Sequence, residues 1–370
     1  MEESEGDTAP GTDEGVTFRL CHISDLHFST VMDRLNGLEV ADTARARSGW
    51  VMSQLLKGNP YKPSYPSTFR VDVALKLLRA LADEQKRGHA DGLIVTGDLA
   101  TTGLDADLLT AKNYFSGDVP PQWLPVGKCP SLLDGDGVVI TLPGNHDRYE
   151  GVALMPGGRR FEQHFGRSWD FDRGNACDPY AVTGPSRVRT CVLEKKDQKT
   201  RLGIVLADFS LDSAHAARGP LGWVGQGAAS CIEELCSATQ VLRSQAQEEG
   251  LDMAVLWAVH FPPFFPGLDS NLQLIGERGF AAAAQQAGIP LILAGHTHQA
   301  LRYELGGANP VSVLCCGSSA GRGRDEVHSY TRIALDVGQG GKLLALRAEQ
   351  MKWDIEALAF VGTGAYPAHP

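Results

Sequence analysis

Seven side chains that can bind a metal ion follow short apolar runs of the sequence, each just past the end of its run. They are Asp25, His27, Asp98, Asn145, His260, His296 and His298. The set offers three oxygen donors and four imidazoles, and it contains no thiolate. This mixture suits a pair of borderline or hard cations such as Mn, Fe, Zn or Ni. It suits neither a cysteine-type structural zinc site nor an all-oxygen calcium site.

The spacing within two of these groups lets neighbouring side chains aim at one point. In an extended chain, residues two apart point the same way, so Asp25 would lie beside His27, and His296 beside His298. Glycine permits the tight backbone turns that such loops need. It stands directly before three of the groups, at positions 97, 144 and 295.

The apolar runs that carry these residues have the length of buried strands. The runs are 18–23, 93–96, 138–142, 253–259 and 291–294. Helical periodicity is found between several of them, notably at 71–87 and 228–248. Strands that alternate with helices indicate an α/β layered fold, in which ligand sites form at the carboxyl ends of the strands.

Beyond residue 306 the pattern changes to strands without long helices. These strands are expected at 311–315, 330–336 and 342–348. A glycine-rich turn at 338–341 predicts a hairpin between the last two.

Five segments occur in the order D-x-H, G-D, G-N-H-D, H and G-H-x-H between Asp25 and His298, and this order resembles the calcineurin-like metallophosphoesterase family. The resemblance implies a four-layer αββα sandwich of two mixed β-sheets flanked by helices. It also implies two divalent or trivalent metal ions. One would be bound by Asp25, His27, Asp98 and His298, and the other by Asp98, Asn145, His260 and His296. Asp98 would bridge the two ions.

Each segment alone has a simpler explanation. His260 at the end of an apolar strand is typical of a core histidine, and Asp98 after a glycine is typical of a turn or a helix cap. The joint occurrence of all five segments favours the metal site. The remaining histidines, apart from His146, are assigned to structural or surface roles, although His22 inside the first strand could support a ligand.

The resemblance also implies the chemistry of phosphate ester hydrolysis. Two cations about 3.5–4 Å apart lower the pKa of a bridging water, and the resulting hydroxide attacks phosphorus in line. His146 is adjacent to Asn145 and surplus to the seven ligands. We therefore predict that it hydrogen-bonds the phosphoryl group or protonates the leaving alkoxide, and that His146 and Asp98 are the catalytic residues. Asp147 either orients His146 or its loop, or merely caps local structure.

The motifs give fewer clues to which phosphate ester is the substrate. The G-N-H-D and G-H-T-H segments are similar to those of class III cyclic nucleotide phosphodiesterases, which favours a phosphodiester of a small nucleotide-like molecule. Many of those enzymes carry a carboxylate where this sequence has Thr101. The alternative is a phosphomonoesterase or pyrophosphohydrolase of the same fold; a non-catalytic scaffold is disfavoured because all seven ligands are present. Phe261, Phe264 and Phe265 could stack on a base or stiffen a proline-containing loop.

Composition narrows the partners and the compartment. The 370 residues are 43% hydrophobic and 21% charged, with a formal net charge of -10. This negative charge disfavours bulk nucleic-acid binding, whereas a small phosphorylated substrate can bind where metal ions reverse the local charge. No apolar run approaches the roughly 20 residues that span a membrane. The 8 cysteines show no C-x-x-C spacing, so we expect a soluble, cytoplasmic protein of undetermined oligomeric state.

We expect one metallophosphoesterase domain over residues 16–355. Residues 1–15 are acidic and predict a disordered tail, and residues 356–370 predict a C-terminal tail. The segment 28–69, which is rich in proline and aromatic residues, has the length of a cap over the cleft. A second stretch, 151–187, also has the composition of an insertion.

Overall fold

The structure is a computed structural model of the 370-residue chain. It describes residues 15–29, 69–101, 103–123, 125–135, 137–148, 160–167, 169, 171, 187–196, 198–212, 229–263, 274, 276–307, 309–321, 327–364, 366 and 367. Within these residues, no helix is long and apolar enough to cross a membrane.

The first of two six-stranded sheets has the strand order β12-β11-β10-β1-β2-β3. Its strands are β1 (Val16–Ile23), β2 (Gly92–Val95), β3 (Val138–Thr141), β10 (Ser329–Val337), β11 (Leu343–Asp354) and β12 (Ala359–Gly362). Strands β1, β2 and β3 are parallel, whereas β10, β11 and β12 pair antiparallel. The carboxyl ends of the three parallel strands therefore meet at one edge of the sheet.

The second sheet has the order β4-β5-β6-β7-β9-β8. Its strands are β4 (Val188–Glu194), β5 (Thr200–Ala207), β6 (Asp252–Val259), β7 (Leu291–Ala294), β8 (Leu301–Leu305) and β9 (Val311–Cys315). The four inner strands are parallel, and the edge strands β4 and β8 pair antiparallel with their neighbours. Both sheets are mixed, as predicted.

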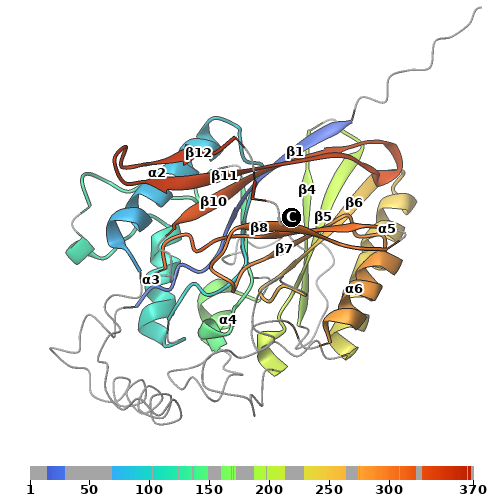
Figure 1. Cartoon of the computed structure of the whole chain (residues 1–370), viewed down its shortest axis with the longest axis horizontal. Coiled ribbons are helices and arrows are strands. Elements are labelled where there is room, and N and C mark those ends of the chain that lie inside the picture. The colour runs from blue at the N-terminus through green and yellow to red at the C-terminus, as the bar shows by residue number, and fades with distance from the viewer. Residues whose placement is uncertain are drawn as a thin grey trace, which may run out of the picture.

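Helices cover the outer faces of the two sheets (Figure 1). The helices are α2 (Val71–Lys86), α3 (Asp105–Phe115), α4 (Arg160–Phe165), α5 (Ala229–Glu248) and α6 (Glu277–Gln286). Strand β6 shows how the layers are built: Leu256 lies in the core between the sheets, whereas its neighbour Trp257 packs with Leu235 of α5 and Phe280 of α6. Side chains alternate between the faces of a strand, so both faces of β6 are buried. The predicted four-layer αββα fold is confirmed.

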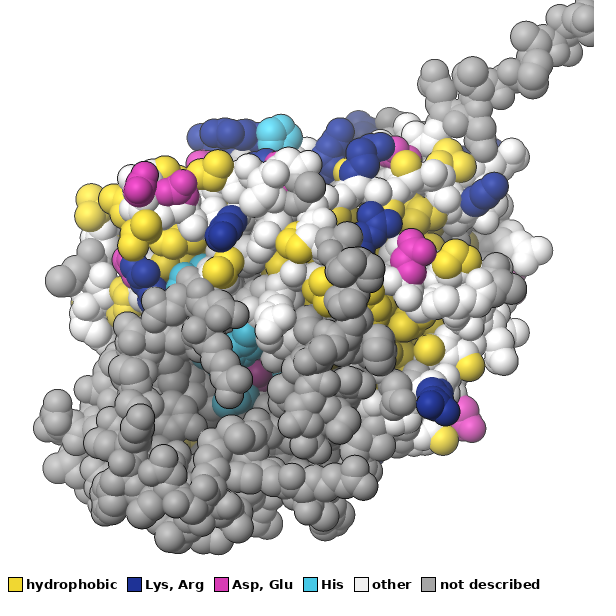
Figure 2. Space-filling model, viewed as in Figure 1, with side chains coloured by type: hydrophobic (Ala, Val, Ile, Leu, Met, Phe, Trp, Pro, Cys, Tyr) yellow, Lys and Arg dark blue, Asp and Glu magenta, His cyan; other side chains and the backbone are white. Residues whose placement is uncertain are grey.

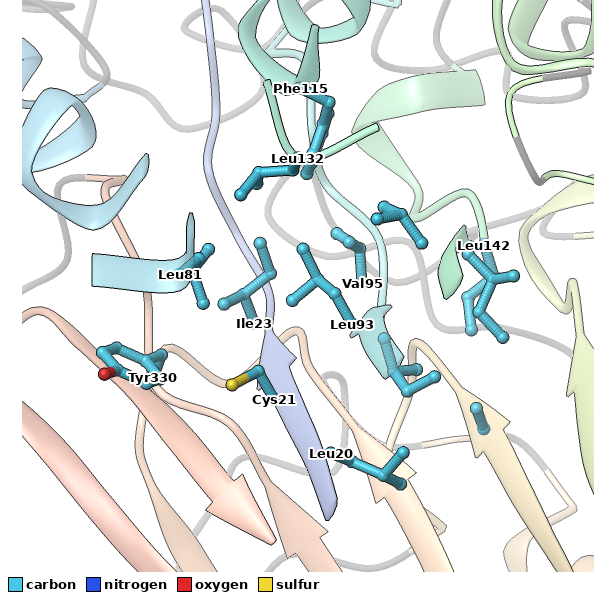
Figure 3. Close-up of a cluster of buried hydrophobic side chains, with 14 of the residues drawn as sticks. Leu20, Cys21, Ile23, Leu81, Leu93, Val95, Phe115, Leu132, Leu142 and Tyr330 are labelled. Atoms are coloured by element: carbon cyan, nitrogen blue, oxygen red, sulfur yellow. The ribbon is translucent and has the colours of Figure 1, made fainter. Parts of the chain in front are cut away.

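Three of the apolar runs form β1, β2 and β3 and supply core residues on both faces of the first sheet (Figure 3). Ile23 of β1 clusters with Leu93 of β2 and Leu81 of α2, whereas Leu20 points to the opposite face of β1. Helix α2 presents its apolar stripe to this cluster, since its buried residues recur at three- and four-residue spacing. The core thus fixes the strands whose ends carry the predicted ligands.

The C-terminal segment differs from the predicted loose tail. Within 356–370, residues 359–362 form β12, which pairs antiparallel with β11. The Tyr366 side chain is buried, and its hydroxyl donates to the Cys315 carbonyl at 2.6 Å. The Arg302 backbone N–H also donates to the Pro367 carbonyl at 2.7 Å. These contacts attach the segment to both sheets.

The two predicted insertions are described only in part. Residues 30–68 of the predicted cap lie outside the described residues, as does nearly all of the predicted N-terminal tail, so both stay predictions. In the second stretch, α4 belongs to the scaffold: Phe161 and Phe165 are fully buried in the core. Of the elements described, β4, β5, β8, β12, α3, α4 and α6 were not anticipated from the sequence.

Candidate metal centre

The structure brings all seven predicted ligands together at the carboxyl ends of parallel strands. Asp25 and His27 follow β1, Asp98 follows β2 and Asn145 follows β3, all from the first sheet. The second sheet supplies the rest: His260 after β6, and His296 and His298 after β7. Neither sheet alone completes the site, so its geometry depends on how the two sheets pack.

The backbone at the site departs from the extended conformation assumed from the sequence. Asp25, His27, Asp98, His296 and His298 all have positive φ angles, of 56°, 52°, 54°, 69° and 56°. Side chains other than glycine rarely adopt this left-handed region. Asp25 and His27 do lie together, but through left-handed turns rather than by extended spacing, whereas His296 and His298 belong to different groups of metal-binding atoms. Such backbone strain is typical of functional sites.

Glycine at 144 and 295 allows parts of the chain to approach closely, beyond the turn role predicted for it. A β-carbon at Gly144 would overlap the Asp98 carboxylate, and one at Gly295 would overlap the Ser24 hydroxyl. Neither Gly144 nor Gly295 has a positive φ. Both glycines are needed because another loop of the site packs against their backbone.

One half of the centre is formed by Asp25, His27 and His298, whose metal-binding atoms all lie within 4.8 Å of one another. The Nε2 atoms of His27 and His298 are 3.0 Å apart, and His298 Nε2 is 3.2 Å from Asp25 Oδ1. The Asp25 side chain is fully buried, and its Oδ2 accepts a hydrogen bond from the His296 backbone N–H at 3.0 Å. Convergence of two imidazoles and a carboxylate on one small volume is the arrangement of a transition-metal site.

The other half is formed by Asp98, His260 and His296, whose metal-binding atoms also lie within 4.8 Å of one another, with Asn145 beside them. His260 Nδ1 donates to the Thr96 carbonyl at 2.6 Å, which directs Nε2 toward Asn145 Oδ1 at 3.1 Å and Asp98 Oδ2 at 3.4 Å. His296 Nε2 is buried without a hydrogen-bond partner among the described residues. A cation would satisfy these converging acceptor atoms, so the donor set fits a metal.

Electrostatics show that this half of the site favours a positive charge. Burial alone would lower the pKa of His260, but the Asp98 carboxylate outweighs it and raises that pKa to about 9. The pKa of Asp98 is held well below its usual range: burial opposes this shift, and the charges of His260 and His146 drive it. The pKa of the neighbouring His296 is lowered to about 3 by burial and by His260. A metal ion would replace the proton on His260.

His146 lies beside one residue of each half of the candidate centre. One of its ring nitrogens is within 4.8 Å of the metal-binding atoms of His27 and Asp98, and its ring contacts His27 edge-on at 4.7 Å. Nδ1 donates to the Thr101 carbonyl at 2.8 Å, which fixes the ring orientation. Burial lowers the pKa of His146 to about 4, although Asp98 opposes this shift.

Asp147 holds two loops of the site together. Its carboxylate accepts backbone hydrogen bonds from Leu99 at 3.2 Å, Ala100 at 2.8 Å and Gly144 at 2.9 Å. These contacts join the loop of Asp98 to the loop of Asn145. Of the two roles considered for Asp147, these contacts favour orientation of the loop that carries His146, because a local cap would not bond to Leu99 and Ala100 of a distant segment.

Several supporting residues were missed by sequence reasoning. The Thr96 carbonyl orients His260, and the Thr96 hydroxyl bonds His22 Nε2 at 2.8 Å, which places His22 behind the site. Ser318 Oγ donates to the Asp25 carbonyl at 3.0 Å. No sequence signal marks Thr96 or Ser318, because small polar residues at strand ends are common in turns.

Of the roles left open for Phe261, the structure disfavours stacking on a base. Its side chain is fully buried in the outer core of the second sheet, and its ring packs edge-on against His296 at 4.7 Å. Phe264 and Phe265 lie outside the described residues. Phe261 thus supports a predicted ligand instead of facing a substrate.

Burial differs among the residues of the site. Asp25, Asp98, Asn145 and His260 are buried, whereas the His298 side chain is 28% exposed. Histidine and acidic side chains are visible on this face of the molecule (Figure 2). Of these five residues, His298 is therefore the most accessible.

Two mixed sheets with metal-binding side chains at their converging strand ends define a metallophosphoesterase. The model of the calcineurin-like phosphoesterases matches residues 18–300, and this chain belongs to that family. A dimetal phosphatase from Danio rerio is similar in structure, with 12% identity, a TM-score of 0.50, and coverage of 90% of this chain and 95% of that one. This likeness shows the fold alone.

A 5′-nucleotidase precursor from Thermus thermophilus has 14% identity, a TM-score of 0.45, and coverage of 95% of this chain and 56% of that one. No curated protein matches the sequence closely enough to count as a relative. The family resemblance seen in the motifs is thus confirmed, and the family implies divalent metals held by the aspartate and histidine clusters.

Proposed function

We propose that the protein is a dinuclear-metal phosphoesterase that hydrolyses a phosphodiester bond of a small nucleotide-like substrate. The observation that carries the proposal is the position of Asp98. Its carboxylate lies 3.7 Å from His27 Nε2 in one half of the centre and 3.4 Å from His260 Nε2 in the other. A single carboxylate between two sets of imidazoles can be shared by two metal ions.

In this proposal Asp25, His27, Asp98 and His298 bind one ion, and Asp98, Asn145, His260 and His296 bind the other. The ligand set holds only two carboxylates, so two divalent ions would leave a net positive centre, which attracts an anionic phosphate ester. When bound, the pair of ions activates water and polarises phosphoryl oxygens. The choice among Mn, Fe, Zn and Ni is left to experiment.

The role that we propose for His146 follows from its place over Asp98. The Thr101 carbonyl holds Nδ1, so the opposite edge of the ring is directed at the reacting phosphate. There it binds a phosphoryl oxygen or, once protonated, donates a proton to the leaving alkoxide. A diester with an alkyl leaving group needs such a donor more than an activated aryl diester does, because an alkoxide is the more basic leaving group.

The alternative activity is a phosphomonoesterase or pyrophosphohydrolase on the same fold. A scaffold without catalysis is the weaker candidate, because all seven donors converge. For location we propose the cytoplasm, because six of the seven described cysteines are buried, as is usual for structural thiols of a reducing compartment.

A substrate panel tests the proposal. The protein is freed of metal, loaded with Mn, Fe, Zn, Ni or Mg, and assayed with bis(p-nitrophenyl) phosphate, cyclic nucleotides, p-nitrophenyl phosphate and a nucleoside diphosphate. We expect kcat/KM to be higher for a diester than for the monoester. A preference for the monoester or diphosphate would establish the alternative activity. Tight metal binding without turnover of any ester would favour the scaffold.

A further inference from the structure

A buried ion-pair network lies directly behind the candidate metal centre. Arg148 follows the G-N-H-D segment, and its side chain is fully buried. Its guanidinium donates to Asp208 Oδ2 at 2.7 and 3.1 Å, and to the two Glu162 carboxylate oxygens at 2.6 and 2.8 Å. The planar guanidinium thus holds two carboxylates in fixed directions.

The network joins the two sheets at the level of the ligands. Arg148 belongs to the loop after β3 of the first sheet, whereas Asp208 directly follows β5 of the second. Strands β5 and β6 are parallel, with Ala207 opposite Val259. Asp208 therefore occupies the position on β5 that the candidate ligand His260 occupies on the neighbouring β6.

The short turn that contains Arg148 also carries the site residues of the first sheet. Residues His146–Arg148 form a single 3-10 turn, in which the Arg148 backbone N–H donates to the Asn145 carbonyl at 3.2 Å. The His146 backbone N–H donates to Asp98 Oδ1 at 2.9 Å. One 3-10 turn has little stability of its own and depends on side chains at its ends.

Two side chains hold this turn from opposite sides. Asp147 attaches it to the loops of the first sheet through Leu99, Ala100 and Gly144. Arg148 attaches it to the second sheet through Asp208. The candidate second metal needs Asn145 from one sheet and His260 from the other, so the separation of these two residues must be fixed closely.

Stability alone is a weak reason for this network. Removing the charges of Arg148 and Asp208 from water is unfavourable, and apolar side chains of similar volume often stabilise a fold equally well. A fixed geometry is the better explanation. Resting on the proposed metal site, we propose that Arg148 is a positioning residue: with Asp208 it sets the distance between the Asn145 loop and the strand end that carries His260.

The test compares Arg148→Met with a matched control, Arg332→Met. Arg332 lies on β10 and pairs with the buried Glu84 of α2 and with Glu349, so its loss also leaves a buried carboxylate without its cation. Neither of those partners is a candidate metal ligand. Both variants should lower the Tm. Only Arg148→Met should change the metal centre.

The decisive readout is Mn²⁺ binding to the full-length chain, measured by calorimetric titration and by the electron paramagnetic resonance signal of coupled Mn²⁺ pairs. We expect Arg148→Met to retain the first ion and to bind the second about 10- to 100-fold more weakly, the range for loss of a residue behind a ligand. The coupled-pair signal should fall accordingly. Arg332→Met should bind both ions within about twofold of the unaltered protein.

The inference is overturned if Arg148→Met has a lowered Tm, as the control does, yet binds both Mn²⁺ ions with unchanged affinity and keeps the coupled-pair signal. If Arg148→Met does not fold, Asp208→Asn serves in its place, because it keeps the shape of the side chain and removes the charge that faces Arg148. An unchanged second affinity in Asp208→Asn would then overturn the inference. Failure of the unaltered protein to bind two ions would instead contradict the metal site itself.

Discussion

The backbone N–H of His146 donates a hydrogen bond of 2.9 Å to Oδ1 of Asp98. The proposed bridging carboxylate is therefore held by the same turn that carries the proposed proton donor. Its other oxygen, Oδ2, is left to face His27 and His260. This arrangement couples the position of the metals to the position of His146.

Asp98→Ala should reduce activity more than the loss of a ligand that serves one ion. Both ions lose a ligand, and the buried imidazoles lose the negative charge between them. We expect kcat to fall by about 10³-fold or more, which corresponds to several kcal/mol of lost charge stabilisation. The measurement is kcat at saturating Mn²⁺. It is compared with the kcat of His298→Ala, which removes a candidate ligand of one ion only. An equal or smaller loss in Asp98→Ala would contradict the bridging role.

His146→Ala should keep both metals, because His146 is outside the proposed ligand set. Its kcat on a diester with a basic leaving group should fall about 10²- to 10⁴-fold, the range for a positioned acid, and less on bis(p-nitrophenyl) phosphate. Equal losses on the two substrates would indicate stabilisation of phosphoryl charge instead. Loss of metal, measured by elemental analysis, would make His146 a ligand or a support of one.

The stability of the metal-free protein should have a maximum near pH 6.5. The pKa of His260 is raised to about 9, and that of His298 is also raised, so their contribution is complete below about pH 6.5 and is lost as the pH rises toward 9. The pKa values of His22 and His296 are lowered to about 3, so the unfolded chain gains protons first, and stability is lost as the pH falls below about 6.5.

Thermal unfolding across pH 5–9, with and without Mn²⁺, measures this effect. The metal-bound protein should gain stability over the metal-free one as the pH rises, because binding displaces protons from the imidazoles. A metal-free Tm that increases steadily from pH 6.5 to 9 would show that His260 and Asp98 do not interact as described.

Tyr366→Phe should destabilise the fold, contrary to the expectation of a loose tail. The buried hydroxyl donates to the Cys315 carbonyl at 2.6 Å and accepts from Thr331 Oγ1 at 3.2 Å. Its loss removes both hydrogen bonds and should lower the free energy of unfolding by about 1–3 kcal/mol. Denaturant titration checks this value. An unchanged midpoint would show that residues 366–367 do not contribute to the fold.

The sequence predicts β1, β2, β3, β6 and β7, whose apolar runs precede the ligand motifs, and β9, β10 and β11 beyond residue 306. It misses the inner strand β5, although that strand is almost fully buried. It also misses the edge strands β4 and β8, because they are buried only in part and their apolar residues alternate with polar ones. Strand β12 is missed for the same reason: it pairs with one neighbour at the edge of the first sheet. Packing, which the local pattern does not encode, makes these segments strands.

The same distinction applies to the site. The residue types and their order are local, so the sequence alone could point to seven side chains that the structure brings together. The contacts behind them are not: Arg148 is 60 positions from Asp208, and only the pairing of the two sheets brings them together. The left-handed backbone of the five candidate ligands is likewise imposed by tertiary contacts, since sequence propensity favours glycine in that conformation.

The most direct test of the central claim is the metal content of the purified protein and its dependence on one shared residue. Elemental analysis after loading with Mn²⁺, Fe²⁺, Zn²⁺ or Ni²⁺ and removal of excess metal should find close to two ions per chain for the unaltered protein. Asp98→Ala should retain fewer than one, because both ions lose a ligand. One ion per chain in the unaltered protein, or full retention of two in Asp98→Ala, would contradict a dinuclear centre bridged by Asp98.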